Sequence, residues 1–433
     1  MAARPRRHQA CDPLQKGDPV TASSAPPPPP SPTLAKGIRR ASLGTLFLTV
    51  FLDLLGFGLV IPFLPGIARR LGAGDFMATM PAAVFSVMQF IFIPIWGRLS
   101  DRVGRRPVLL WSIAASAIGM ALLGVAPSLV LLFAARIWSG VATANIAVAQ
   151  AYIADVTPPE QRSRGMAIIG IAFGLGFIFG PFIGGELSRF HIFGREGMLP
   201  PFVAAGLSTI NFLLALRTLP ESLPAEARGR SVRKATPIDL GAFRAAVAVP
   251  GVGAAVAINF IFYLWFSGME QTFRLFTADG FGMSDAGTGR VFALVGVVSA
   301  VVQGGLVSRL VPRFGEGRLI RGGLAITAAA FALLGISPLF GAWGKAALLT
   351  ASALIACGSG LTSPTLPAFA SRRASATTQG LTLGTLQSAS ALARALGPIL
   401  GGALYAGISP RAPYLIGAAG LLGAALLAAA RLR

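Results

Sequence analysis

The sequence predicts an all-α integral membrane protein whose twelve transmembrane helices form two pseudo-symmetric halves of six. The chain of 433 residues is 54% hydrophobic and only 12% charged. It contains about a dozen apolar stretches near the ~20 residues that a bilayer requires. Two of these stretches share one pattern, Gly180-Pro181-Phe182-Ile183-Gly184-Gly185 and Gly397-Pro398-Ile399-Leu400-Gly401-Gly402. A repeat at this separation indicates two copies of one membrane unit.

The predicted spans are apolar runs of membrane length. In the first half they cover 43–64, 79–96, 108–126, 129–153, 165–187 and 199–219. In the second half they cover 247–266, 291–307, 319–339, 346–369, 381–405 and 414–430. The polar break between the sixth and seventh spans has the composition of a linker. We therefore expect a tail at 1–40, a first half at 41–220, a cytoplasmic linker at 221–245 and a second half at 246–433.

The formal charge of +21 is distributed unevenly along the chain. Lys and Arg cluster in alternate connections, at 36–40, 98–106, 162–164, 228–234, 309–321, 372–373 and 431–433. Cytoplasmic connections of membrane proteins carry such an excess of Lys and Arg. The pattern predicts a multi-pass protein of the plasma (inner) membrane with both termini in the cytoplasm, and it argues against nucleic-acid binding.

Residues 1–35 are rich in Pro, Ala and Ser, with an unbroken run of proline at 26–30. This composition offers no apolar periodicity to bury and predicts a disordered tail, or alternatively a Pro-rich ligand for a partner. The cysteines, Cys11 and Cys357, cannot pair across the tail and a span, and the histidines are His8 and His191. No metal-ligand spacing or paired catalytic groups are present, so we expect no metal, no cofactor and no enzymatic activity.

The connection after the second span reads Gly97-Arg98-Leu99-Ser100-Asp101-Arg102-Val103-Gly104-Arg105-Arg106-Pro107-Val108-Leu109. It resembles the loop signature of the major facilitator superfamily, Gly-x-Leu-x-Asp-Arg-x-Gly-Arg-Arg/Lys-x-x-Leu. The fifth span is similar to the signature of the drug:proton antiporter branch, which here comprises Gly176, Gly180, Pro181, Gly184 and Gly185. Residues 52–62 and 136–155 resemble the first and fourth spans of bacterial tetracycline-efflux proteins.

The resemblance implies a major facilitator fold and a proton-coupled antiporter that exports small hydrophobic compounds or drugs by alternating access. Its expected partners are a small lipophilic substrate, protons and membrane lipid, and it is expected to work as a monomer. Tetracycline-efflux proteins carry an acid in the third span where this chain has Gly119, which disfavours tetracycline itself as substrate. A proton symporter that imports a metabolite and a non-transporting membrane receptor are the alternatives.

An acid and a base fall at membrane depth. Asp53 lies ten residues into the first span, ~15 Å from the cytoplasmic edge and near the bilayer centre. A carboxylate there costs roughly 2.5 to 3.5 kcal/mol on insertion scales, which indicates that Asp53 has a functional role. Arg136 enters from the opposite side to a similar depth, with Thr143 and Gln150 expected on the same helical face. We expect Asp53 and Arg136 to couple protons; a purely structural ion pair is the alternative.

Other candidate residues line the cavity or the cytoplasmic loop. The substrate cavity is expected to include Phe57, Thr143, Gln150, Gln303, Gln387 and Arg394. Glu270 is expected at the outer end of the seventh span, as a surface or gating charge. By resemblance, a conformational latch between the halves comprises Gly97, Asp101, Arg102, Gly104, Arg105 and Arg106, with Asp155 as a charge partner. The basic residues of this loop also serve as topology anchors.

Overall fold

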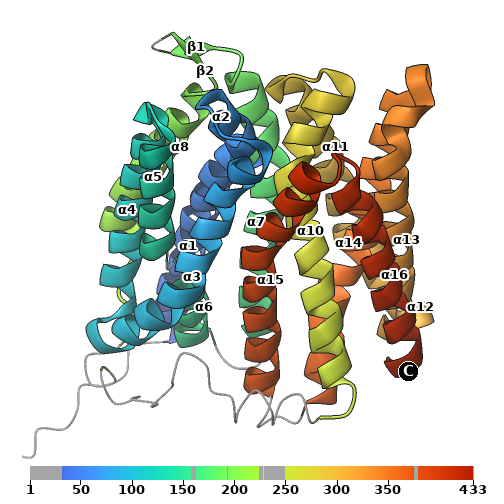
Figure 1. Ribbon diagram of the computed structural model, residues 1–433. Helices are drawn as coiled ribbons and strands as arrows, with labels where there is room; N and C mark the ends of the chain where they lie inside the picture. Colours follow the sequence, from blue (N-terminus) through green and yellow to red (C-terminus); the bar gives the residue numbers. More distant parts are fainter. Residues whose placement is uncertain are drawn as a thin grey trace, which may run out of the picture. The chain divides into compact units, whose positions relative to one another are not determined.

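The computed structural model describes residues 32–143, 145–157, 162–192, 194–223, 228, 249–374 and 379–432. The predicted tail up to residue 31 and most of the predicted linker lie outside the described residues. The pattern of contacts divides the chain into two units, residues 1–38 and residues 39–433. The helix packing concerns the second unit. Its described residues are helical apart from short connections and a β-hairpin (Figure 1). This confirms the predicted all-α membrane class.

The helices fall into two groups along the chain. The N-terminal helices are α1 (Pro32–Val60), η1 (Ile61–Phe63), α2 (Leu64–Arg70), α3 (Asp75–Val103), α4 (Arg105–Val125), α5 (Leu129–Ala142), α6 (Asn145–Val156), α7 (Arg162–Leu187) and α8 (Leu199–Thr218). The C-terminal helices are α10 (Val252–Phe281), α11 (Asp285–Val301), the π-helix η4 (Val302–Leu306), α12 (Val307–Phe314), α13 (Glu316–Ile336), η5 (Ser337–Trp343), α14 (Gly344–Arg373), α15 (Gln379–Gly407) and α16 (Ala412–Arg431). Strands β1 (His191–Ile192) and β2 (Arg195–Glu196) pair antiparallel.

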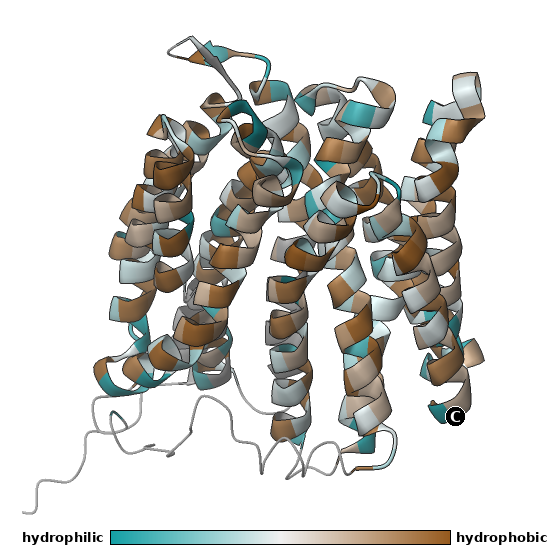
Figure 2. Cartoon of the chain, in the orientation of Figure 1, coloured by the Kyte–Doolittle hydropathy of each residue, from teal (hydrophilic) through white to brown (hydrophobic). Residues whose placement is uncertain are grey.

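The composition of the helices fits a membrane. In the described residues, eight helical stretches are long and apolar enough to cross a bilayer, and two shorter apolar stretches cover Leu129–Ala142 and Gly174–Leu187. Hydrophobic residues dominate the middle of the helices, and hydrophilic residues gather near their ends (Figure 2). We call the end that carries β1–β2 the hairpin end, and the other the opposite end.

The helix predicted for 129–153 is interrupted, and this part of the prediction is wrong. α5 ends before Thr143, whose backbone is extended, and α6 begins at Asn145. Arg136 lies on α5 and Gln150 on α6. These residues therefore do not share one continuous helical face.

The interruption leaves backbone carbonyls that neighbouring helices satisfy. Trp96 Nε1 on α3 donates to the Val141 carbonyl at 2.5 Å. Ser112 Oγ on α4 donates to the Ala142 carbonyl at 2.7 Å. Side chains from adjacent helices can stabilise a broken helix at membrane depth in this way.

The seventh predicted span differs most from the structure. Helix α10 runs on to Phe281, fifteen residues beyond the predicted end at Phe266. Glu270 therefore lies inside a long helix, and its expected place at the outer end of the span is wrong. The polar residues that lower the hydropathy here are buried, as Gln271 and Thr272 show.

The repeated glycine pattern has the same packing role in both groups of helices. A Cβ added to Gly180 of α7 would lie 2.7 Å from Gly58 Cα on α1, and one added to Gly397 of α15 would lie 2.6 Å from the Leu264 carbonyl on α10. Only glycine allows backbones to approach this closely. Each copy thus brings its helix against the first helix of its own group.

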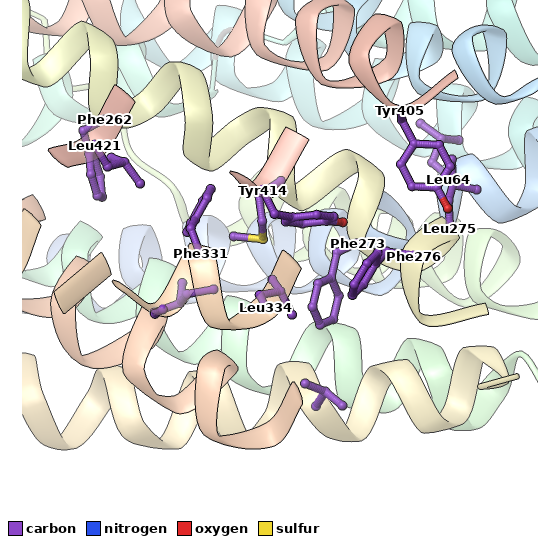
Figure 3. Close-up of a cluster of buried hydrophobic side chains, with 14 of the residues drawn as sticks. Leu64, Phe262, Phe273, Leu275, Phe276, Phe331, Leu334, Tyr405, Tyr414 and Leu421 are labelled. Atoms are coloured by element: carbon purple, nitrogen blue, oxygen red, sulfur yellow. The ribbon is translucent and has the colours of Figure 1, made fainter. Parts of the chain in front are cut away.

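A buried hydrophobic cluster joins α10 to α16, which in turn packs against α13. Phe262 and Phe276 of α10, Phe331 of α13, and Tyr414 and Leu421 of α16 belong to it (Figure 3). The Tyr414 and Phe276 ring centroids lie 4.6 Å apart. This packing positions the polar face of α10 that is described below.

Candidate functional site

The two groups of helices meet at the hairpin end along two seams, α3 against α15 and α7 against α11. The last glycine of each repeat lies at a seam. A Cβ on Gly185 would lie 2.8 Å from the Asp285 carbonyl, and one on Gly402 would meet Thr79 Oγ1. Thr79 Oγ1 also donates to the Pro398 carbonyl at 2.9 Å. We call Gly185, Gly402 and Thr79 the glycine seal.

Ion pairs also join the two groups of helices at the hairpin end. Arg69 at the end of α2 donates from Nη1 and Nη2 to the two carboxylate oxygens of Asp279 on α10, at 2.7 and 2.8 Å. Arg69 also bonds Asp75 of α3, and Tyr405 of α15 donates to Asp279 at 2.6 Å. We call Arg69, Asp279 and Tyr405 the hairpin-end clamp.

Two further ion pairs join the groups nearby. Asp285, at the start of α11, is buried and bonds both Arg70 of α2, at 3.2 Å, and Arg274 of α10. Arg290 of α11 bonds Glu186 of α7 at 2.8 Å. The hairpin end is therefore held by charges from both groups of helices.

At the opposite end, Arg105 organises a charged cluster within the N-terminal helices. Its guanidinium contacts Asp101 at 2.6 Å and Asp155 at 3.1 Å, and it donates to Ser100 Oγ. Arg102 is exposed, and Gly97 accepts a hydrogen bond from Ser100. The proposed role of these residues as a latch between the halves stays a prediction.

Glu221, just after α8, completes the cluster. Its carboxylate accepts the backbone N–H groups of Arg105 at 2.9 Å and Arg106 at 3.2 Å, the first residues of α4. Anions are favourable at a helix N-terminus, where N–H groups lack partners. Gly104 has φ +110°, and a Cβ there would collide with Glu221. The glycine of the loop signature thus makes room for a carboxylate that sequence reasoning missed.

In the interior, Arg136 lies against the aromatic ring of Phe85. Only 1% of its surface is exposed, its guanidinium lies 4.4 Å from the Phe85 ring centroid, and Nε and Nη2 have no hydrogen-bond partner among the described residues. Phe57 packs on the same ring, 5.7 Å between centroids. Asp53, half-buried, precedes Phe57 by one helical turn on α1. The structure thus places Phe57 and Arg136 on the same Phe85 ring, and the Asp53–Arg136 pair stays a prediction.

A second polar group lies between α10 and α15. The Arg394 guanidinium is 5.4 Å from the Tyr263 ring centroid and close enough to Glu270 for an electrostatic interaction. Gln387 precedes Arg394 by two helical turns on α15 and is exposed. Gln303 is also exposed, on the π-helix η4.

Several functional candidates were not found from the sequence. Arg69, Asp279 and Asp285 were not among the candidate residues, because the partners that give them a role lie far away along the chain. The sequence did hold one signal for these residues: two acids, Asp279 and Asp285, flank the short turn between α10 and α11. The described residues hold no cluster of three or more His, Cys, Asp or Glu suited to a metal ion.

Known proteins are similar to this chain in sequence and fold. Residues 46–395 match the family model of the Major Facilitator Superfamily. The tetracycline resistance protein, class C, of Escherichia coli is 35% identical and covers 87% of this chain and 92% of its own length. The human Major facilitator superfamily domain-containing protein 10 is 30% identical, with coverage of 84% and 88%. The crystal structure of the human organic anion transporter MFSD10 (TETRAN) gives a TM-score of 0.66 at 28% identity, covering 90% of this chain and 99% of that one. The chain belongs to the Major Facilitator Superfamily.

Proposed function

We propose that this transporter is a proton-coupled antiporter that exports small hydrophobic compounds by alternating access. The main support is the carboxylate Asp53 at membrane depth. It lies one helical turn from Phe57, which packs on Phe85, and the buried Arg136 guanidinium lies over the same Phe85 ring. Ionisable residues inside the membrane mark proton or substrate pathways. The likeness to tetracycline resistance proteins supports export.

Alternating access has structural support at both ends. The glycine seal and the hairpin-end clamp join the two groups of helices, whereas the Arg105 cluster lies within the N-terminal helices. In our proposal the halves are 41–220 and 246–433, and the hairpin end faces outside the cell. The structure then represents a cytoplasm-open state, and export requires the clamp and seal to separate.

The interior favours a lipophilic cargo. Rings of Phe57, Phe85 and Tyr263 supply apolar and cation–π contacts. Gln303 and Gln387 are exposed and can donate hydrogen bonds. These groups suit a compound with a large apolar surface and few polar atoms.

The unpartnered nitrogens of Arg136 favour a second candidate, transport of an organic anion. A related protein carries the name organic anion transporter. In this alternative, protonation of Asp53 would leave Arg136 available to the anion, so that proton and cargo travel in the same direction. This corresponds to the symport mechanism.

The sign of a luminal pH change separates the two mechanisms. Proteoliposomes loaded with a pH-sensitive dye would receive ethidium, tetracycline or 2-naphthoate outside, with protein-free liposomes as reference. Cargo entry through an antiporter expels protons and makes the lumen alkaline, whereas symport makes it acidic. Export by antiport is contradicted if every transported probe acidifies the lumen.

Asp53→Asn tests the proton site. The variant keeps the side-chain shape but cannot titrate, so coupled pH changes should disappear while the protein stays inserted and folded. Thermal unfolding of Asp53→Asn, Arg136→Gln and the double variant tests the pair. We expect the double variant to be more stable than the sum of the single effects predicts, because no charge is left unpaired. Strict additivity would contradict the pair.

A further inference from the structure

Glu270 is a second carboxyl at membrane depth. It precedes the end of α10 by eleven residues, which is about 16 Å along the helix axis. Asp279, the clamp residue, follows nine residues later. Two residues before Glu270, Gly268 packs closely against Gly397 and Gly401 of α15. Glu270 thus lies between the packed middle of α10 and its charged end.

The backbones of α10 and α15 are locked together beside Glu270. Cβ atoms added to Gly268 or Gly401 would lie 2.9 Å from backbone atoms of the facing helix. Ser267 Oγ, one turn before Glu270, donates to the Arg394 carbonyl at 3.4 Å. The main chain of Arg394 is therefore held close to α10, and its long side chain is the part with the most freedom to change place.

That side chain lies between two groups on one face of α10. Tyr263 and Glu270 are seven residues apart and so share a helical face. The Arg394 guanidinium lies 5.4 Å from the Tyr263 ring centroid and interacts electrostatically with Glu270. Among the described residues, however, Glu270 has no hydrogen bond or ion pair. In the described part of the chain, Arg394 thus stacks on the Tyr263 ring and forms no ion pair with Glu270.

The other charged and titratable groups near this part of α10 are engaged elsewhere. Tyr414 of α16 bonds Thr272 at 3.1 Å. The remaining groups meet α10 one turn or more beyond Glu270: Asp285 of α11 at Arg274, and Arg69 of α2 and Tyr405 of α15 at Asp279. Arg394 is thus the charged group that faces Glu270 in the described part of the chain.

We propose that Glu270 is a second proton-binding carboxyl of this transporter, in addition to Asp53. The proposal rests on the proton coupling proposed above. The Glu270 side chain is partly exposed, and its carboxylate takes a proton from water when Arg394 stacks on Tyr263. When the guanidinium moves to Glu270, the proton returns to water, because a carboxylate next to a cation favours its charged form. No covalent bond other than the O–H bond forms or breaks.

Infrared difference spectra test proton binding without any cargo. The purified protein in lipid would be titrated with acid while the C=O stretch of protonated carboxyl groups is recorded. We expect Glu270→Gln to lose one carboxyl band of the parent, and Glu270→Asp to keep a band at a shifted frequency. Glu186→Gln, at the exposed end of α7, is the matched control and should retain the Glu270 band.

Arg394→Met separates a proton site from a merely structural acid. Removal of the guanidinium should change the pH range over which the Glu270 band appears, with a control circular dichroism spectrum that shows a folded helix bundle. An unchanged set of carboxyl bands in folded Glu270→Gln would overturn the proposal. If Asp53→Asn loses a band and Glu270→Gln does not, only the role of Glu270 is refuted. If the Glu270 band is present but no probe moves protons in proteoliposomes, the transport mechanism fails and the site stands.

Discussion

Arg69 and Asp279 form a two-pronged ion pair across the hairpin end, with hydrogen bonds of 2.7 and 2.8 Å between residues 210 positions apart. Planar guanidinium and carboxylate groups match in this geometry. The Tyr405 hydroxyl holds the same carboxylate from a third helix. The pair therefore joins α2 of the N-terminal group to α10 of the C-terminal group, where the proposed alternating-access cycle separates them.

We predict that Asp279→Asn favours opening at the hairpin end. The variant keeps an acceptor for Tyr405 but loses the charge that holds Arg69. The side chains are 26% and 36% exposed, so the loss should be about 1 kcal/mol at most, or roughly a five-fold change in state populations. Spin labels on the α2–α3 and α10–α11 turns, in a background with Cys11 and Cys357 replaced by Ser, report the distance.

Asp75→Asn is the matched control for the clamp. Asp75 bonds the same guanidinium but lies on α3, within the N-terminal helices. We expect its distance distribution to remain that of the parent. Equal shifts of the label distances in both variants would contradict a specific role of the Arg69–Asp279 pair. They would mean that opening at the hairpin end responds to any loss of an acid beside Arg69.

We predict that Gly185→Ala and Gly402→Ala also shift the protein toward the state open at the hairpin end. Each new methyl group would collide with the other group of helices, at the Asp285 carbonyl or at Thr79. The collision is relieved when the seams part. Gly174→Ala on α7 and Gly407→Ala on α15 place a methyl group in open space and should leave the label distances unchanged.

The apolar helices of membrane length and the glycine repeat could be predicted because they depend on local composition. The end of α10 could not, since Thr272 and Arg274 look like loop residues until Tyr414 and Asp285 are placed beside them. The break between α5 and α6 likewise depends on Trp96, a donor from another helix. The clamp and the Glu221 contact join residues more than one hundred positions apart, and neither sequence periodicity nor spacing encodes such pairs.

We predict opposite effects for the two glycines of the loop signature. Gly104→Ala forces a side chain into φ +110° and against Glu221, which should lower the unfolding free energy by roughly 1–3 kcal/mol. Gly97 lies within helix α3, where no atom would lie within 4 Å of the new Cβ. Gly97→Ala should therefore be neutral or stabilising by up to about 1 kcal/mol. Thermal unfolding of the purified variants measures both, and equal destabilisation would contradict this reading of Gly104.

We predict that Asp101→Asn shifts the protein toward the cytoplasm-open state. Asp101 contacts Arg105 at 2.6 Å at the opposite end, far from the proposed cargo site. If Asp101 stabilises the state that is closed at that end, Asp101→Asn should reduce turnover by increasing the cytoplasm-open population, with cargo affinity changed only by the fraction of competent molecules. Spin labels on the opposite ends of the two groups should report a larger population of long distances. Asp155→Asn removes a different contact of the same Arg105, at 3.1 Å. An identical effect of both variants would show that Asp101 acts only through the Arg105 cluster, and an unchanged distance distribution with lost transport would exclude the latch altogether.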